Sequence, residues 1–344
     1  MSPSPTTSGT LQHLSFAWFA MVMGLCGLSL AWSRAVPHWG AGAMQVSQVV
    51  GVLAAGVLAV LLLGQLWRLL RHPAVLLAEV SHPLRHVFVA ALPASLVLLP
   101  TVWVAHRGYS LWAELVWMLG AAGLLLATLS VVRRWLQPGL VAQDFWPVMT
   151  PVLFIPVVGN VLPALAGVGL GHPFWAAAQF GVGAVMWPVV LALVWVRIGM
   201  VGVWPQRLLP TTFIAIAPPS VLALSGAALG APELLVQMLA GVALFFTLLS
   251  LTVLRRCLQQ NFGMPFWGVS FPLAASAALA LHLSPAAGMA QSLAVLYLLC
   301  VTGVIGALLL ATLRGLWRGE LLQPEGSVFP PGAGAVQSLP EGPA

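Results

Sequence analysis

Residues 261–283 read NFGMPFWGVSFPLAASAALALHL, and this stretch decides the fold. It carries no charged side chain and is long enough to cross a bilayer, which takes about 20 apolar residues. Pro272 follows Phe271 near its middle, and the small residues 274–278 come next. A proline inside a helix removes one backbone hydrogen bond and leaves the carbonyl of Gly268 without its usual partner. A membrane tolerates such a defect only where protein or water covers it. The kink, the bulky ring beside it and the face of small residues together predict a constriction rather than a mere anchor.

The composition of the whole chain predicts a membrane protein that crosses the bilayer many times. Of its 344 residues, 60% are hydrophobic and 6% are charged, whereas soluble domains have about 25% charged residues. The net charge of +6 comes from thirteen scattered arginines, which favours loop charges that set orientation over a surface for nucleic acid. The three cysteines, Cys26, Cys257 and Cys300, have no paired spacing, so neither a disulfide framework nor a metal site is expected.

Hydropathy predicts an all-α domain at residues 14–313, with disordered tails at 1–13 and 319–344. Ten spans are expected, and an even number places both ends of the chain on the same side of the membrane. In chain order they are Leu14–Trp32, Met44–Trp67, Val87–Ala105, Leu111–Val132, Val148–Val168, Phe174–Val196, Leu208–Leu229, Leu234–Leu254, Pro265–Leu283 and Ala290–Leu313.

The arginines predict which side that is. Eleven of them lie in the loops after even-numbered spans or in the C-terminal flank, and only Arg34 and Arg107 lie in loops after odd-numbered spans. Cytoplasmic loops carry an excess of basic residues, so both termini are expected in the cytoplasm.

Proline placement predicts how the spans are arranged. Residues such as Pro93, Pro156, Pro218 and Pro272 lie well inside odd-numbered spans, whereas Pro188 is the one comparable proline in an even-numbered span. Kinked helices need neighbours to cover their freed backbone groups, and straight helices can face lipid. We therefore expect five helical hairpins, with an inner ring of kinked odd helices around a pore and an outer ring of even helices. Gly24 in the first span is expected to allow close packing.

The expected lumen has no titratable group at membrane depth, because the odd spans contain no Asp, Glu, Lys or Arg. Its polar groups are neutral and include Asn160 and Ser276. Such a lumen can pass anions by size and hydration cost, with arginines at the cytoplasmic rim raising the local anion concentration. No nucleophile–base cluster or metal site suggests an enzyme, and no cofactor is expected.

Two polar positions leave alternatives open. Glu79 lies in HPAVLLAEVSHP, residues 72–83, and is either a coupling or substrate site or part of a short interfacial helix. In the second case its carboxylate pairs with Arg68, Arg71 or Arg85. Asn160 either contacts a permeating ion or makes an interhelical hydrogen bond.

Three stretches resemble one known family, the tellurite-resistance/dicarboxylate transporter (TehA) family, which includes the slow anion channels of plant guard cells. They are HPAVLLAEVSHP with the following FVAALPAS, IAPPSVLAL in the seventh span, and FWGVSFPLAASAALALHL in the ninth. The resemblance covers about residues 14–313. It implies ten helices in five hairpins, a trimer with one pore per subunit, and a phenylalanine plug that falls on Phe271. The first span departs from the family pattern, with Ala17 and Ala20 adding methyl groups that narrow the lumen.

The sequence therefore predicts an anion channel or uniporter of a bacterial inner membrane, gated by Phe271. Expected partners are the lipid bilayer, further copies of the chain, and small anions: chloride, nitrate, mono- or dicarboxylates, and tellurite as a further candidate. The alternatives are a proton-coupled C4-dicarboxylate carrier, with Glu79, His82 or His282 as the titratable group, and a tellurite-resistance exporter.

Overall fold

The computed structural model describes residues 11–138, 141–285 and 287–323, and every regular element in these ranges is a helix. In the described residues nine helices are long and apolar enough to span a membrane, and the number is ten when the pair at residues 142–167, bent by 74°, is counted as one span. Helices thus lie at all ten predicted spans. Most of the predicted tails, residues 1–10 and 324–344, lie outside the described residues.

The even-numbered spans are single long helices. Helix α4 has 31 residues, about 46 Å at 1.5 Å per residue, which exceeds the hydrocarbon core of about 30 Å. A helix of this length is longer than the bilayer core is thick, so its ends would extend past the core. The even-numbered spans are α4 (Ala41–Arg71), α7 (Leu111–Trp135), α11 (Pro173–Val201), α13 (Glu233–Leu258) and α15 (Met289–Trp317).

The odd-numbered spans are composite, and each begins with a 3₁₀ segment before its α-helix. The fifth span is the most broken and changes type three times. The spans are η1 (Phe16–Trp18) with α2 (Phe19–Arg34), η2 (Arg85–Ala90) with α6 (Ala91–Arg107), η3 (Pro151–Leu153) with α9 (Phe154–Val158), η4 (Gly159–Val161) and α10 (Ala164–Gly167), η5 (Gln206–Ile216) with α12 (Ala217–Ala228), and η6 (Met264–Val269) with α14 (Ser270–Leu283).

The four prolines expected to kink the odd spans lie at these junctions rather than in the middle of long helices, which corrects the expected position of the breaks. Pro93, Pro156 and Pro272 are each the third residue of an α segment, and Pro218 is the second. The first turn of a helix is where a missing N–H costs least. The backbone changes from 3₁₀ to α at these points, and Gly268 lies in the 3₁₀ segment η6.

The composite spans form a closed inner ring. Contacts run from α2 to α6, from α6 to α10, from α10 to α12, from α12 to α14, and from α14 back to α2. In the first, third, seventh and ninth spans 61–83% of the residues are buried, against 17–33% in the even-numbered spans. Each even helix packs against the odd span that precedes it, which gives the five predicted hairpins.

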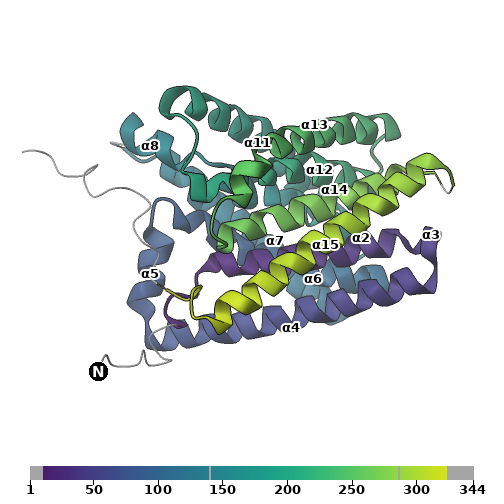
Figure 1. Cartoon of the computed structure of the whole chain (residues 1–344), viewed down its shortest axis with the longest axis horizontal. Coiled ribbons are helices and arrows are strands. Elements are labelled where there is room, and N and C mark those ends of the chain that lie inside the picture. The colour runs from purple at the N-terminus through teal and green to yellow at the C-terminus, as the bar shows by residue number, and fades with distance from the viewer. Residues whose placement is uncertain (1–10, 139–140, 286, 324–344) are drawn as a thin grey trace, which may run out of the picture.

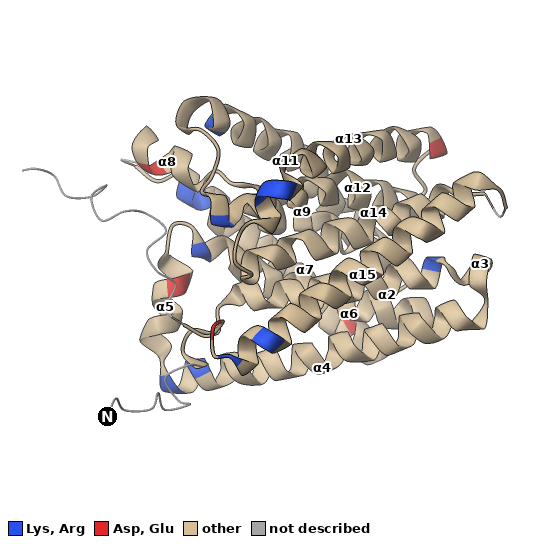
Figure 2. Ribbon diagram, viewed as in Figure 1, with Lys and Arg blue, Asp and Glu red and all other residues tan. Residues whose placement is uncertain are grey.

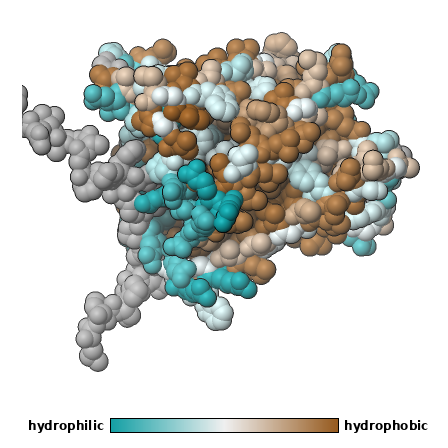
Figure 3. Space-filling view, turned by 45° about the horizontal axis from the view of Figure 1, so that its top comes forward, coloured by the Kyte–Doolittle hydropathy of each residue, from teal (hydrophilic) through white to brown (hydrophobic). Residues whose placement is uncertain are grey.

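The surface of the bundle is that of a membrane protein. Large apolar side chains on the even helices are exposed, and Figure 3 shows hydrophobic surface over most of the body, with hydrophilic residues gathered near one end. The short helices α5 (Pro73–Ser81) and α8 (Ala142–Val148) lie at that end, and α3 (Val36–Trp39) lies at the other (Figure 1). Most arginines are also near α5 and α8, as Figure 2 shows. We call these the arginine-rich end and the arginine-poor end.

Candidate functional site

Three cavities lie inside the inner ring. The N-side cavity, about 350 Å³, is at the arginine-rich end and is lined by the first residues of the odd spans, Ala17, Arg85 and Arg207 among them. The central cavity is only about 60 Å³ and is lined by apolar side chains from η6 and the helices α2, α9, α12 and α14. The C-side cavity, about 270 Å³, opens toward the arginine-poor end. The lumen is thus wide at both ends and narrow in the middle.

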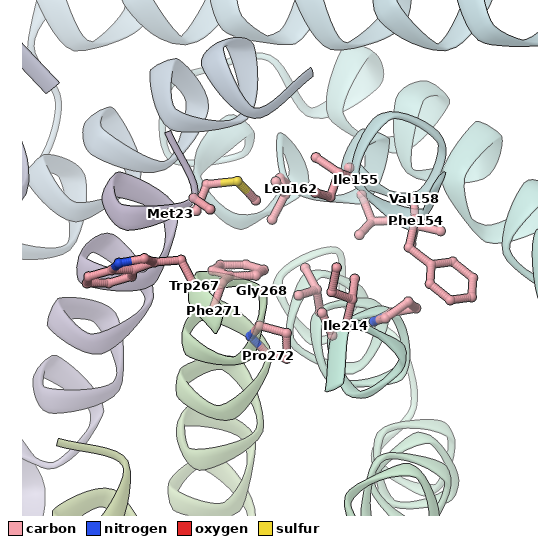
Figure 4. Close-up of a pocket in the computed structure, with 16 residues that line it drawn as sticks. Met23, Phe154, Ile155, Val158, Leu162, Ile214, Trp267, Gly268, Phe271 and Pro272 are labelled. Carbon is pink, nitrogen blue, oxygen red and sulfur yellow. The ribbon is translucent and has the colours of Figure 1, made fainter. Parts of the chain in front are cut away.

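Phe271 lies at the narrow point. Its side chain lines both the central and the C-side cavities, and it is 8% exposed. Figure 4 shows the ring among the apolar side chains of the central cavity, with Met23 above it and Ile214 to its right in that view. Phe271 and Val221 both line the two cavities, and Phe271 is the aromatic residue of the two, so its ring lies where the cavities adjoin.

Two glycines of α2 allow α14 to bring the ring there. A Cβ atom on Gly24 would lie 2.1 Å from the hydroxyl oxygen of Ser270, so any side chain at this position forces the helices apart. A Cβ atom on Gly27 would lie 3.0 Å from Cδ2 of Phe271. Gly24 therefore sets the distance between the helices, and Gly27 leaves room for the ring. Ala20, whose methyl group was expected to narrow the lumen, lines the central cavity.

The segment before Phe271 is fixed by hydrogen bonds at the start of α14. Ser270 Oγ donates to the carbonyl oxygen of Trp267 at 2.7 Å. The indole of Trp267 is fully buried and donates to Thr312 Oγ1 of α15 at 2.9 Å. These bonds connect the 3₁₀–α junction that precedes Phe271 to helix α15 of the outer ring.

The predicted proline positions divide into two groups. Pro218 and Pro272 line the central cavity. Pro93 instead packs on α7, where a Cβ atom on Gly123 would lie 2.8 Å from Pro93 Cβ. The carbonyl oxygen of Pro156 accepts a hydrogen bond from Thr128 Oγ1 of the same helix α7. Pro93 and Pro156 therefore shape the ring from its outer side.

Asn160 and Ser276, which the sequence placed at the pore, are not among the residues that line the three cavities, and both side chains bond to outer helices. Asn160 Nδ2 donates to Thr128 Oγ1 at 2.6 Å, and its Oδ1 accepts from Gln179 Nε2 at 2.8 Å. Asn160 is fully buried, so of the two alternatives the interhelical hydrogen bond holds. Ser276 Oγ lies 2.7 Å from the hydroxyl of Tyr297 on α15. A buried polar group in a membrane must find a partner, and here the outer helices provide it.

Glu79 lies in the predicted short helix but is buried rather than exposed. Its Oε2 is 2.6 Å from Arg68 Nη2, and both side chains are at most 3% exposed. Its Oε1 accepts the backbone N–H of Phe16 at 2.8 Å, and Arg68 donates to the carbonyl oxygens of Gln12 and Leu14. The pair therefore anchors the chain that leads into the first span. Residues 12 and 13, assigned to the tail by sequence, belong to this anchored segment.

Arg85, another of the three expected partners of Glu79, lines the N-side cavity together with it. Arg68 takes the ion pair, and the buried Nε of Arg85 has no hydrogen-bond partner within the described residues. Arg85 and Arg207 thus supply positive charge at the arginine-rich mouth of the lumen, with Glu79 and Glu320 as the carboxylates there. No group of three or more potential metal ligands forms in the described residues.

Sequence reasoning missed Arg34 as a lumen residue, because it follows the first span and looks like a loop charge. The structure places it in the wall of the C-side cavity. Its Nη1 lies 3.0 Å from Nδ1 of His282, at the end of α14. The lumen therefore carries arginine at both mouths and an apolar constriction between them. The sequence signal that could have identified Arg34 is its position directly after the first inner span.

Comparison with known proteins gives one family. The family model described as SLAC1, voltage-dependent anion channel, matches residues 13–313. A tellurite resistance protein TehA homolog of Haemophilus influenzae is 26% identical over 313 residues, covering 89% of this chain and 92% of that protein. Two uncharacterized transporters of Methanocaldococcus jannaschii are 22% and 23% identical, covering 76% and 75% of this chain and 82% and 80% of theirs.

Proposed function

The chain belongs to the SLAC1 family of voltage-dependent anion channels, and we propose that it is an anion channel or uniporter in which Phe271 closes the lumen. The observation that carries this proposal is the position of Phe271 between the narrow central cavity and the wide C-side cavity. Rotation of one aromatic side chain would join the two cavities without unpacking the ring of helices.

The charge distribution supports anions as the permeating species. Arg85 and Arg207 at one mouth and Arg34 at the other raise the local concentration of anions. The central cavity has an apolar lining, so an ion there pays a dehydration cost that favours weakly hydrated monovalent anions. Chloride, nitrate and small carboxylates are the substrates we propose. The name of the Haemophilus influenzae relative makes tellurite a further anion to test.

The position of Glu79 argues for a channel rather than a proton-coupled carrier. A coupling carboxylate must exchange protons during transport, whereas Glu79 is held by Arg68 and by the N–H of Phe16. A fixed ion pair at the edge of the lumen is what a structural anchor requires. We assign Glu79 to that role.

We further propose a bacterial inner-membrane location with the arginine-rich end in the cytoplasm, and assembly as a homotrimer. The arginine asymmetry supports the orientation.

The orientation is tested in a chain whose Cys26, Cys257 and Cys300 are replaced by serine. Trp39→Cys and Gln137→Cys are introduced one at a time and labelled with a membrane-impermeant maleimide. Labelling of intact cells at 39 but not at 137 is expected, and the reverse pattern would invert the orientation. Mass measurement of the detergent-solubilised protein tests the trimer.

The experiment that tests the channel is anion current in planar bilayers, with wild type compared with Phe271→Ala. Because the phenyl ring of Phe271 is proposed to obstruct the lumen, the variant is expected to conduct strongly and wild type weakly. Phe88→Ala, which alters a phenylalanine at the N-side mouth, is the matched control and should leave the current low. Equal currents from wild type and Phe271→Ala, with both proteins monodisperse, would reject the gate.

A further inference from the structure

The C-side cavity differs from the other two in being lined by a single guanidinium, that of the half-buried Arg34. Its lining residues come from α2, α6, α10, α12 and α14, and Phe271 forms its floor toward the central cavity. Arg34 is the charged residue among them, and no carboxylate lies among the described residues that line this cavity. At about 270 Å³ the cavity is large enough for a small anion together with some of its water.

Arg34 is also the residue best placed to donate hydrogen bonds into this cavity. The hydroxyls of Ser33 and Thr101 line it too, but each donates to a backbone carbonyl of its own helix, at Leu30 and Val97. A guanidinium has five N–H donors, and one is directed at Nδ1 of His282. That bond holds the guanidinium in one orientation and leaves its other donors for a ligand.

From this geometry we propose that Arg34 forms a binding site for a permeating oxyanion at the C-side of the gate. The ligand class is a small planar anion with two adjacent oxygens, such as nitrate or a carboxylate. A guanidinium binds two such oxygens side by side, whereas chloride offers one point of contact. The inference rests on the proposed channel function and adds a binding step to it. His282 is the positioning residue of the site.

Three substitutions separate the parts of this proposal. Arg34→Gln removes the charge and the fork of donors, and Arg34→Lys keeps the charge but loses the fork. Arg107→Gln is the matched control, since Arg107 is exposed at the same end of the bundle and is not among the residues that line the cavity. All three are made in the conducting Phe271→Ala background.

The measurement is single-channel conductance against nitrate and chloride concentration. Charge-assisted hydrogen bonds contribute about 1.5–3 kcal/mol, so Arg34→Gln is expected to raise the half-saturating nitrate concentration at least ~10-fold. Arg34→Lys is expected to lower the preference for nitrate over chloride while retaining anion selectivity. Arg107→Gln is expected to match its parent.

The outcomes distinguish this site from the channel itself. Absence of current in Phe271→Ala alone rejects the proposed function. If Phe271→Ala conducts but Arg34→Gln and Arg107→Gln have the same half-saturating nitrate concentration in that background, the binding site is rejected. A nitrate preference that is unchanged in Arg34→Lys rejects the bidentate contact. If Arg34→Gln fails to fold, the nitrate preference of Arg34→Lys decides the proposal.

Discussion

Replacing Glu79 with glutamine tests whether this carboxylate is a structural anchor. The side chain accepts two hydrogen bonds, from Arg68 Nη2 at 2.6 Å and from the N–H of Phe16 at 2.8 Å. Glutamine has the same shape but only one acceptor oxygen, so one of these donors must face an NH₂ group. Arg68 also keeps its charge in a site where it is 2% exposed.

The expected cost follows from that uncompensated charge. Removing one partner of a buried ion pair destabilises a protein by about 3–5 kcal/mol. The double variant Arg68→Met/Glu79→Leu removes both charges and is expected to recover much of the loss. Glu233→Gln, at an exposed position, serves as the control and should have little effect.

The assay is the fraction of monodisperse protein that survives heating in detergent, followed by size-exclusion chromatography. Glu79→Gln is expected to aggregate well below the wild-type temperature and the double variant close to it. An unchanged melting temperature in Glu79→Gln, together with loss of proton-linked substrate flux in liposomes, would refute the anchor. That pair of results would favour the proton-coupled carrier.

Three further predictions concern packing, the buried amide and pH. Gly24→Ala is expected to cost about 1–3 kcal/mol by overpacking against Ser270, and Ser270→Gly should restore stability; no loss in the same heating assay would show that the helices are not in contact there. Asn160→Ala leaves a buried N–H of Gln179 without its acceptor and Thr128 Oγ1 without a donor, and should cost about 1–3 kcal/mol, yet it should not change anion selectivity in the Phe271→Ala background; altered selectivity would return Asn160 to the pore wall. Burial, reinforced by Arg85, lowers the pKa of His82, whose neutral Nδ1 accepts the backbone N–H groups of residues 84 and 85. The unfolded chain therefore binds the proton first as the pH falls, so this contribution is complete above about pH 6.5 and is lost below it; His82→Asn, which retains an acceptor, should remove the dependence, and identical pH profiles would contradict the role.

The arrangement of the helices was largely predictable from the sequence. Apolar length and arginine distribution define the spans, because the bilayer imposes both. Phe271, singled out by its position before Pro272, lines the central cavity, and its role as a gate stays a prediction. The 3₁₀ segments were not predictable, since 3₁₀ and α turns differ in hydrogen-bond register rather than in the residues they accept.

Side-chain direction and long-range burial were the features that the sequence did not determine. Asn160 lies on a broken helix whose short pieces have no stable periodicity, so its outward direction depends on Thr128 and Gln179. Glu79 is buried by a segment 63 residues away in the chain, which local sequence cannot indicate. Arg34 faces the lumen for a similar reason, because its partner His282 is 248 residues away.

The central claim is that one aromatic ring closes an otherwise continuous anion path. The most direct measurement is the current through single reconstituted proteins in symmetrical chloride, first for wild type and then for Phe271→Ala. The account predicts rare, small openings in wild type and a persistently open, anion-selective conductance in the variant. A variant that stays closed although it is folded, or one that opens without anion selectivity, would contradict it.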